Sequence, residues 1–503
     1  MLAWTIYASF LGALALILLP GNRASWARII ALLTTLVTFA ITLTAFIEYR
    51  TGELLTVTNV PWIKSLGISY TLKADGISLT LLLLTGVIGV TGVLFSWNVE
   101  HRIKEFFAFY LVLVGAVYGV FLSYDLFLLF VFYEIVVIPK YFIIAIWGST
   151  RREYAAMKLV LYSFIGSAMV LIGLIAAFVV AGSKSTSLSD LANYPFPVHF
   201  QMWAFPLVFV GFGILAGLWP FHTWAPTGHV AAPTAASMLL AGVVMKLGAY
   251  GCLRVAMTVF PLGLSPWGFH VLGLGSWRDV FAVLAVIGIL YGALVALVQK
   301  DFKFVIGYSS ISHMGFILLG LMTLNQIGLS GAVVQMVSHG LLAGLLFGVV
   351  GRMVYARTHT RDLATLAPMR LSKIIPFAAA TFVIAGMASM GLPGFSGFVA
   401  ELMIIIGVWR SYPSLIIFVA IGLIAGVAYI WRAMQQAFFS GAATDEPAIL
   451  EHPLPPITFP ERLGAAILIA ASIIVGTFPQ LFLNVIHPAL DSPLFQGLRK
   501  GGW

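Results

Sequence analysis

Long apolar runs, separated by short polar loops, follow one another along almost the whole chain. A helix of about 20 apolar residues is long enough to cross a bilayer. Fourteen such runs predict transmembrane helices near residues 2–20, 29–48, 77–97, 105–124, 125–147, 158–181, 205–225, 230–257, 278–298, 303–323, 327–351, 376–411, 414–440 and 464–483. This pattern predicts an all-α, polytopic membrane protein. Arg23 and Arg28 follow the first run, whereas a signal peptide carries its charges before the apolar stretch, so we expect a first transmembrane helix.

Two of these helices should be interrupted. The run 376–411 is too long for one plain span and contains Gly391-Leu392-Pro393-Gly394, a string that breaks a helix. The seventh run ends in a similar string, Gly217-Leu218-Trp219-Pro220. We therefore predict interruptions in helices 7 and 12.

The spacing of these strings hints at an internal repeat. Gly217 and Gly391 lie 174 residues apart, and Tyr133 and Tyr308 lie 175 apart. Five helices per repeat is an odd number, so the second repeat should be inverted, as in many transporters. The predicted divisions are N-terminal helices 1–3 (1–104), a first repeat of helices 4–8 (105–257), a second repeat of helices 9–13 (278–440), and a loop with helix 14 (441–503).

Composition narrows the class of protein further. The chain is 61% hydrophobic and 9% charged, against about 25% charged residues in soluble domains. Of its 27 Lys and Arg residues, sixteen lie in or beside loops that follow odd-numbered helices and nine in or beside the others. The odd-numbered loops should therefore be cytoplasmic, with both termini on the opposite side. The net charge of +9 reflects this topology and does not indicate nucleic-acid binding.

Five ionisable residues lie deep inside apolar runs: Glu134, Lys246, His313, His339 and Glu401. A charged side chain at the bilayer centre costs roughly 2.5–3.5 kcal/mol on insertion scales. A row of buried titratable groups suits proton movement, and a neutral histidine can relay protons through its two nitrogens. The alternatives are a glutamate that only pairs helices, a lysine that snorkels to the interface and histidines that only pack.

Other residues carry weaker indications. Glu401 follows the break in helix 12, where water can enter and exchange protons, while Trp409 and Arg410 look like an interface anchor. His222 and His229 could bind a metal, but no Cys or carboxylate lies nearby, which favours a structured re-entrant turn. Cys252 is the single cysteine, which excludes an internal disulfide and any all-cysteine cluster. No nucleotide, flavin or haem motif is visible, so we expect no redox centre in this chain.

The chain resembles the antiporter-like chain M subunits of respiratory complex I, the proton-pumping NADH:quinone oxidoreductase. The matching stretches are FYEIVVIPKYFIIAIWG, PFHTWAPTGHVAAPTAASMLLAGVVMKLGAYG, KDFKFVIGYSSISHMGF, QMVSHGLLAGLLFGVVG and GMASMGLPGFSGFVAELMI, which span residues 132–404. The combination separates this family from transporters in general, and less sharply from cation/proton antiporter and membrane hydrogenase relatives.

The resemblance implies a hydrophilic axis within the membrane. Glu134 would be the fifth-helix glutamate, Lys246 the eighth-helix lysine, His313 and His339 the axis histidines, and Glu401 the terminal proton-exchange carboxylate. It also implies that FMN, iron–sulfur clusters and quinone belong to other subunits, with no cofactor or metal here. The expected partners are antiporter-like subunits on both sides and the lipid of a bacterial inner membrane, without nucleic acid.

One departure from the family concerns Glu134. Members usually carry a lysine in helix 7 that pairs with this glutamate, and here that position is Leu215; the family aspartate of the following turn is also replaced, by Thr227. Lys140 follows Glu134 by six residues, about 9 Å of rise and 240° of turn. We hypothesise that Lys140 takes over part of the missing lysine's role through a wet axis; alternatively, it snorkels or meets another helix.

The predicted function is proton translocation driven by distant quinone reduction. Protons would enter from the cytoplasmic side, pass Lys246 and the two histidines, and leave near Glu401. Two alternatives stay open: a subunit of a multi-chain cation/proton antiporter, and a divergent structural paralogue that assembles but does not pump, which the residues Leu215 and Thr227 motivate.

Overall fold

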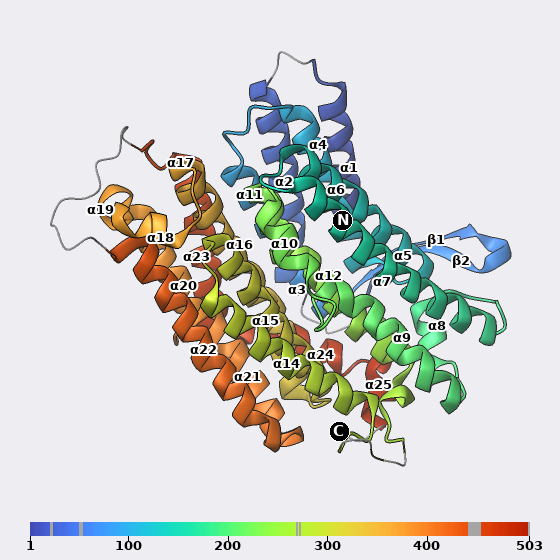
Figure 1. Ribbon diagram of the computed structural model, residues 1–503. Coiled ribbons are helices and arrows are strands. Elements are labelled where there is room, and N and C mark those ends of the chain that lie inside the picture. Colours follow the sequence, from blue (N-terminus) through green and yellow to red (C-terminus); the bar gives the residue numbers. More distant parts are fainter. Residues whose placement is uncertain (21–23, 50–53, 268–269, 271–272, 441–453, 501–503) are drawn as a thin grey trace.

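The computed structural model describes the chain apart from residues 21–23, 50–53, 268–269, 271–272, 441–453 and 501–503. The described residues form a bundle of long helices with one small hairpin (Figure 1). Twelve helices among them are long and apolar enough to cross a membrane. The two other predicted runs correspond to the shorter α1 (Ala3–Leu18) and to the broken pair α20 (Pro376–Ser389) and α21 (Ser396–Ser411). The polytopic helical class is confirmed, and the count of fourteen spans stays a prediction.

The first half of the chain contains the hairpin. Its elements are α2 (Ala24–Glu48), β1 (Leu55–Ile63), η1 (Lys64–Leu66), β2 (Ile68–Ala74), α3 (Gly76–Phe95), α4 (Ile103–Leu122), α5 (Leu126–Ile135), α6 (Val137–Trp147), α7 (Arg152–Val180), α8 (Leu188–Asn193), α9 (Val198–Ala216), α10 (Trp224–Ala231), α11 (Thr234–Leu239), η2 (Leu240–Val244), α12 (Met245–Gly251), η3 (Cys252–Ala256), α13 (Met257–Val259) and η4 (Pro261–Leu264). The strands pair antiparallel in a two-stranded sheet.

The second half is helical where it is described. Its elements are α14 (Trp277–Val298), α15 (Phe302–Met322), α16 (Gln326–Gly348), η5 (Val349–Tyr355), α17 (Ala356–Thr358), α18 (Leu363–Leu366), η6 (Ala367–Met369), α19 (Leu371–Ile374), η7 (Pro413–Leu415), α22 (Ile416–Met434), η8 (Gln435–Phe439), α23 (Phe459–Thr477), α24 (Gln480–Leu490), η9 (Pro493–Phe495) and α25 (Gln496–Lys500). The segments η2, η3, η5 and η8 are π-helical turns, a form often found at functional sites.

Both predicted interruptions are present. The seventh helix stops at Gly217 (φ 82°) and continues as α10, and the twelfth stops before Gly391 (φ 78°) and continues as α21. Glycine adopts this left-handed backbone without steric cost. A third interruption, between α5 and α6 at Val136, was not predicted. Pro139 explains it, because its ring has no N–H for the Ile135 carbonyl and clashes with that group.

The backbone repeats one contact at two places in the chain. Leu126 N–H bonds the Thr186 carbonyl, and Leu188 N–H bonds the Tyr124 carbonyl. The same exchange recurs 175–176 residues later, from Phe302 to Arg361 and from Leu363 to Lys300. The short helices α8 and α18, which begin at Leu188 and Leu363, lie at opposite ends of the bundle (Figure 1). Inverted repeats would produce this arrangement, and the predicted repeat boundaries stay a prediction.

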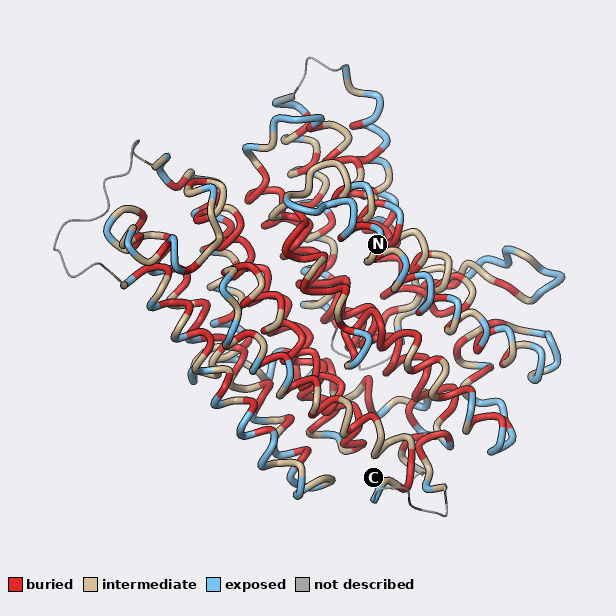
Figure 2. The backbone as a smooth tube through the Cα atoms, in the orientation of Figure 1, coloured by how far each residue is buried: buried red, intermediate tan, exposed pale blue. Residues whose placement is uncertain are grey.

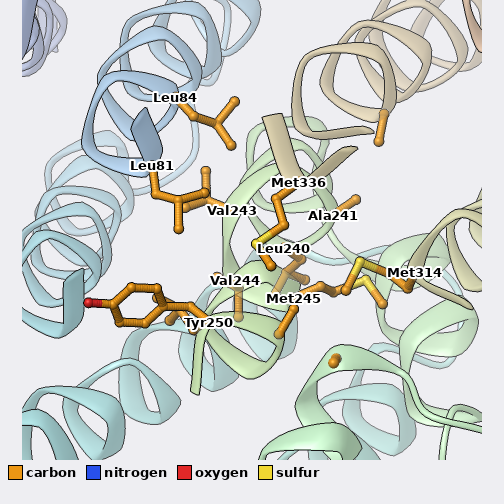
Figure 3. Packing of buried hydrophobic residues seen from close by; sticks show 14 of the residues in the cluster. Leu81, Leu84, Leu240, Ala241, Val243, Val244, Met245, Tyr250, Met314 and Met336 are labelled. Atoms are coloured by element: carbon orange, nitrogen blue, oxygen red, sulfur yellow. The ribbon is translucent and has the colours of Figure 1, made fainter. Parts of the chain in front are cut away.

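Burial divides the helices into a central column and an outer layer (Figure 2). In Thr234–Val259 and Gln326–Thr358 the whole apolar window is buried, whereas outer helices such as α2 and α22 bury 28% of theirs. Close backbone contact holds the column together: a Cβ on Gly340 would lie 2.6 Å from the Gly242 carbonyl oxygen. Small residues permit such approach between membrane helices. Figure 3 shows this centre, with Leu81, Leu84, Leu240, Ala241, Val243, Val244, Met245, Tyr250, Met314 and Met336 labelled.

Candidate functional site

Lys246 lies in the centre of the column, beside His339. It sits on α12 directly after the π-helical turn η2, and its side chain is fully buried. Its Nζ donates to the Ala241 carbonyl of that turn and lies 2.8 Å from His339 Nδ1. The snorkelling alternative for Lys246 is therefore wrong. The close packing of α16 on η2 places the histidine within reach of the amine.

The two predicted histidines face each other across α15 and α16. The rings of His313 and His339 are stacked, with centroids 5.5 Å apart and planes inclined by 28°. His313 Nδ1 lies 3.3 Å from Gln335 Nε2, and its Nε2 lies 3.2 Å from Ser389 Oγ. Both ring nitrogens of His313 therefore have a polar neighbour, as a relay through a neutral imidazole requires.

Glu401 ends this series of contacts. It is buried on α21, just after the break in the twelfth helix, and its Oε1 lies 3.4 Å from His313 Nδ1. Two cavities of about 10 Å³ each adjoin His313 and Glu401, one also lined by Gln335 and His339 and the other by Ser312 and Tyr429. A cavity of this size with polar walls holds about one water molecule.

Lys246, His339, His313 and Glu401 thus form one buried series, which we call the central file. Four of the six predicted site residues belong to it. Their role in proton transfer is a separate matter and stays a prediction. What the geometry provides is a series of groups that can each bind and release a proton, without an apolar side chain between consecutive members.

His229 extends the polar series toward the loops that follow odd-numbered helices. It is fully buried on α10, where its Nε2 lies 3.4 Å from Met245 Sδ. Its Nδ1 has no hydrogen-bond partner among the described residues. Lys303 Nζ donates to the Val230 and Ala232 carbonyls at 3.2 and 2.6 Å. The re-entrant turn expected here is therefore wrong in part, because the segment from Trp224 is helical.

Glu134 and Lys140 lie outside the central file, against α7. Glu134 is half-buried at the end of α5, and its Oε1 has no hydrogen-bond partner among the described residues. Lys140 is 1% exposed, and its Nζ donates to Ser163 Oγ of α7 at 3.0 Å. Lys140 therefore does not snorkel. It meets another helix, as the alternative interpretation proposed.

Helix α9 separates this pair from the central file. It packs against α7 on one side and α12 on the other, and it carries the buried Leu215. Its Phe212 also meets the ring of Tyr133 edge-on, with centroids 5.4 Å apart. Among the described residues, no hydrogen bond connects Glu134 or Lys140 with Lys246. The hydrophilic axis that the resemblance implies between Glu134 and Lys246 stays a prediction.

Sequence reasoning missed several polar partners. Gln335 precedes His339 by one helical turn, and Ser163 precedes Ser167 by the same spacing, so each pair shares a helix face. Arg254 was assigned to a loop end, yet it is 2% exposed and pairs with Asp75 at 2.6 Å. Neutral polar residues carry little signal in an apolar run, and only their spacing from a titratable residue could have revealed them.

Among the described residues, no group of three or more His, Cys, Asp and Glu side chains could hold a metal ion. Comparison with known proteins places the chain in a family.

Residues 123–427 match the family described as NADH:quinone oxidoreductase/Mrp antiporter, TM. The chain belongs to this family. It is similar to NADH-quinone oxidoreductase subunit M of Rhodobacter capsulatus, with 34% identity over 93% of this chain and 90% of that protein.

Two solved structures resemble the whole chain. A chain of respiratory complex I from Thermus thermophilus is 26% identical and matches with a TM-score of 0.87, covering 100% of both chains. A chain of the Mrp complex from Dietzia is 21% identical, with a TM-score of 0.85 over 99% of this chain and 98% of that one. The second likeness concerns the fold alone. All four residues of the central file lie within the matched region.

Proposed function

We propose that this chain is a proton-translocating membrane subunit of an NADH:quinone oxidoreductase, and that protons move along the central file. The observation that carries the proposal is the buried series of neighbouring titratable groups from Lys246 through His339 and His313 to Glu401. The similarity to subunit M of Rhodobacter capsulatus supports the assignment to such a complex.

The file can transfer a proton in short steps. The Lys246 ammonium donates to His339 Nδ1, which lies 2.8 Å from Nζ. The stacked rings of His339 and His313 share no direct hydrogen bond, so one water in the adjoining cavity completes that step. His313 then delivers the proton to Glu401. Moving one charge against 100 mV requires about 2.3 kcal/mol, which corresponds to a pKa swing of roughly two units.

The same proposal includes the direction of proton transfer, the other subunits of the complex and the membrane. Protons enter from the cytoplasmic side past Lys303 and His229 and leave near Glu401. Redox energy arrives from other subunits, which hold FMN, iron–sulfur clusters and quinone, through antiporter-like neighbours on both sides. The membrane is a bacterial inner membrane, and both termini face away from the cytoplasm.

The two alternatives, a subunit of a cation/proton antiporter and a non-pumping paralogue, have less support. The Mrp likeness is one of fold, at 21% identity, while the oxidoreductase relative is 34% identical over nearly its whole length. A non-pumping paralogue would have no reason to keep four titratable side chains in contact at a cost of a few kcal/mol each. We therefore retain proton translocation in an oxidoreductase.

The test is Lys246→Met in the assembled complex, reconstituted in vesicles, with protons translocated per electron as the readout. The expected result is a lower ratio with normal assembly and continued NADH oxidation. Lys184→Met, at an exposed loop lysine, is the matched control and keeps the ratio of the unmodified complex. An unchanged ratio in Lys246→Met contradicts the proposal, and so does a purified complex without flavin and iron.

A further inference from the structure

We propose that Lys140 is the charge partner of Glu134, coupled to it by the hydroxyl groups of Ser163 and Ser167 on α7, and that this second pair controls proton transfer in the central file. Lys140 is a positioning residue in this scheme, because it acts through Glu134 and does not touch the file. The inference rests on the proposed function. It concerns a part of the molecule that the file itself does not use.

The surroundings of Lys140 support its role as a charge partner of Glu134. Its side chain is 1% exposed, and among the described residues its Nζ donates to a neutral oxygen, Ser163 Oγ. No carboxylate of the described residues lies within 4.0 Å of its Nζ. A buried ammonium without a direct counter-ion is costly. Glu134, six residues earlier, is the nearest carboxylate along the chain.

Glu134, in turn, has a carboxylate oxygen that lacks a hydrogen-bond donor among the described residues. This oxygen is the buried Oε1. A carboxylate with a free acceptor and an ammonium with free donors therefore face the same helix. Each one can satisfy the other.

Helix α7 supplies the connection. Ser163 and Ser167 are four residues apart, which places both hydroxyls on one face with about 6 Å of rise between them. Lys140 contacts the first, and α5, which carries Glu134, also packs against α7. Glu134 and Lys140 are six residues apart, about 9 Å of rise, so they reach α7 at different heights.

The arrangement has two states. In the one observed, the lysine bonds Ser163 and the carboxylate oxygen is free. In the other, the flexible lysine stem moves its ammonium along the two hydroxyls toward Glu134. Closing and opening the pair changes the field across α9, in surroundings of low dielectric where a charge acts over a longer range than in water. Lys246 lies beyond that helix.

The experiment compares Lys140→Met, Glu134→Gln, the double variant and Lys140→Arg in the assembled complex, by protons per electron in vesicles. Lys140→Met should lower the ratio as far as Glu134→Gln does. The double variant should lower it no further, because the two residues act as one unit. Lys140→Arg should restore the ratio, which a loss of packing alone does not predict.

A further variant, Ser163→Ala, keeps the lysine and removes one hydroxyl. It should also lower the ratio, even if Lys140→Met fails to assemble. A normal ratio in Ser163→Ala together with additive losses in the double variant overturns the inference. Lys246→Met distinguishes this failure from a failure of the proposed function. If Lys246→Met lowers the ratio while Lys140→Met and Ser163→Ala do not, the proposed role of Lys140 is contradicted and the proposed function of the central file is not.

Discussion

At the scale of single residues, titratable groups were predictable and their neutral partners were not. Lys246, His313, His339 and Glu401 stood out because each interrupts an apolar run. Their contacts depend on helix packing, which the sequence alone does not specify. Gln335 and Ser389, which flank His313, belong to residue types that also occur at ordinary helix contacts in membranes.

The role of Ser389 can be tested directly. Ser389→Ala removes the partner of His313 Nε2. A hydrogen bond contributes about 1 kcal/mol, so proton transfer should slow by roughly five-fold while assembly stays normal. The measurement is the initial rate of proton uptake by vesicles. Ser330→Ala is the control, since Ser330 is equally buried on α16 and its hydroxyl has no partner among the described residues. Equal effects of both variants would contradict the assignment.

Gly391 offers a second test at the same scale. A Cβ at this position would lie 3.0 Å from Glu401 Oε2, and the residue has φ 78°. Gly391→Ala should cost about 1–2 kcal/mol of stability through the left-handed backbone and should also displace the Glu401 carboxylate. Gly394→Ala separates the two effects, because its φ is 95° with nothing within 4 Å of the added carbon. Both variants should melt earlier, and only Gly391→Ala should lower protons per electron.

At the scale of elements, breaks announced by glycine and proline together were predictable. The interruption at Val136 was missed because Pro139 lacks a neighbouring glycine, although proline alone suffices. The β1–β2 hairpin was missed because a search for long apolar windows passes over its alternating Thr and Val residues. The π-helical turns carry no composition that distinguishes them from α-helix.

The ion pair that joins α3 to η3 gives a prediction at this scale. Asp75 and Arg254 are buried and 2.6 Å apart. Asp75→Asn leaves the guanidinium without its counter-ion and should lower the stability of the complex by about 3–5 kcal/mol. The measurement is the thermal unfolding of the purified complex. The double variant Asp75→Leu/Arg254→Met should regain most of the loss, and equal melting of the single variant and the unmodified protein would contradict the prediction.

At the scale of the whole molecule, hydropathy predicted the polytopic helical class and the order of the helices. It could not place Glu134 relative to Lys246, because the family likeness implied a wet axis, whereas α9, which carries the buried Leu215 and Phe212, packs against both α7 and α12. The distribution of Lys and Arg gives an orientation that the coordinates do not test.

That orientation can be measured with introduced cysteines. Glu153 and Lys184 are exposed near opposite ends of α7, and the single native thiol, Cys252, is buried. In intact cells an impermeant maleimide should label Lys184→Cys and not Glu153→Cys, because positively charged loops stay in the cytoplasm. In inverted vesicles the pattern should be the opposite. Labelling of Glu153→Cys in intact cells would reverse the assigned orientation.

The stacked imidazoles have one more consequence. Their ring centroids are 5.5 Å apart, no nitrogen of one is bonded to a nitrogen of the other, and the pocket alongside has room for about one water molecule. Such a pocket is either filled or vacant, and hydration of narrow passages is known to act as a gate. If protons move along the central file as proposed, the step between the two imidazoles requires a water molecule in that pocket. The occupancy of the pocket would then set how often the step occurs.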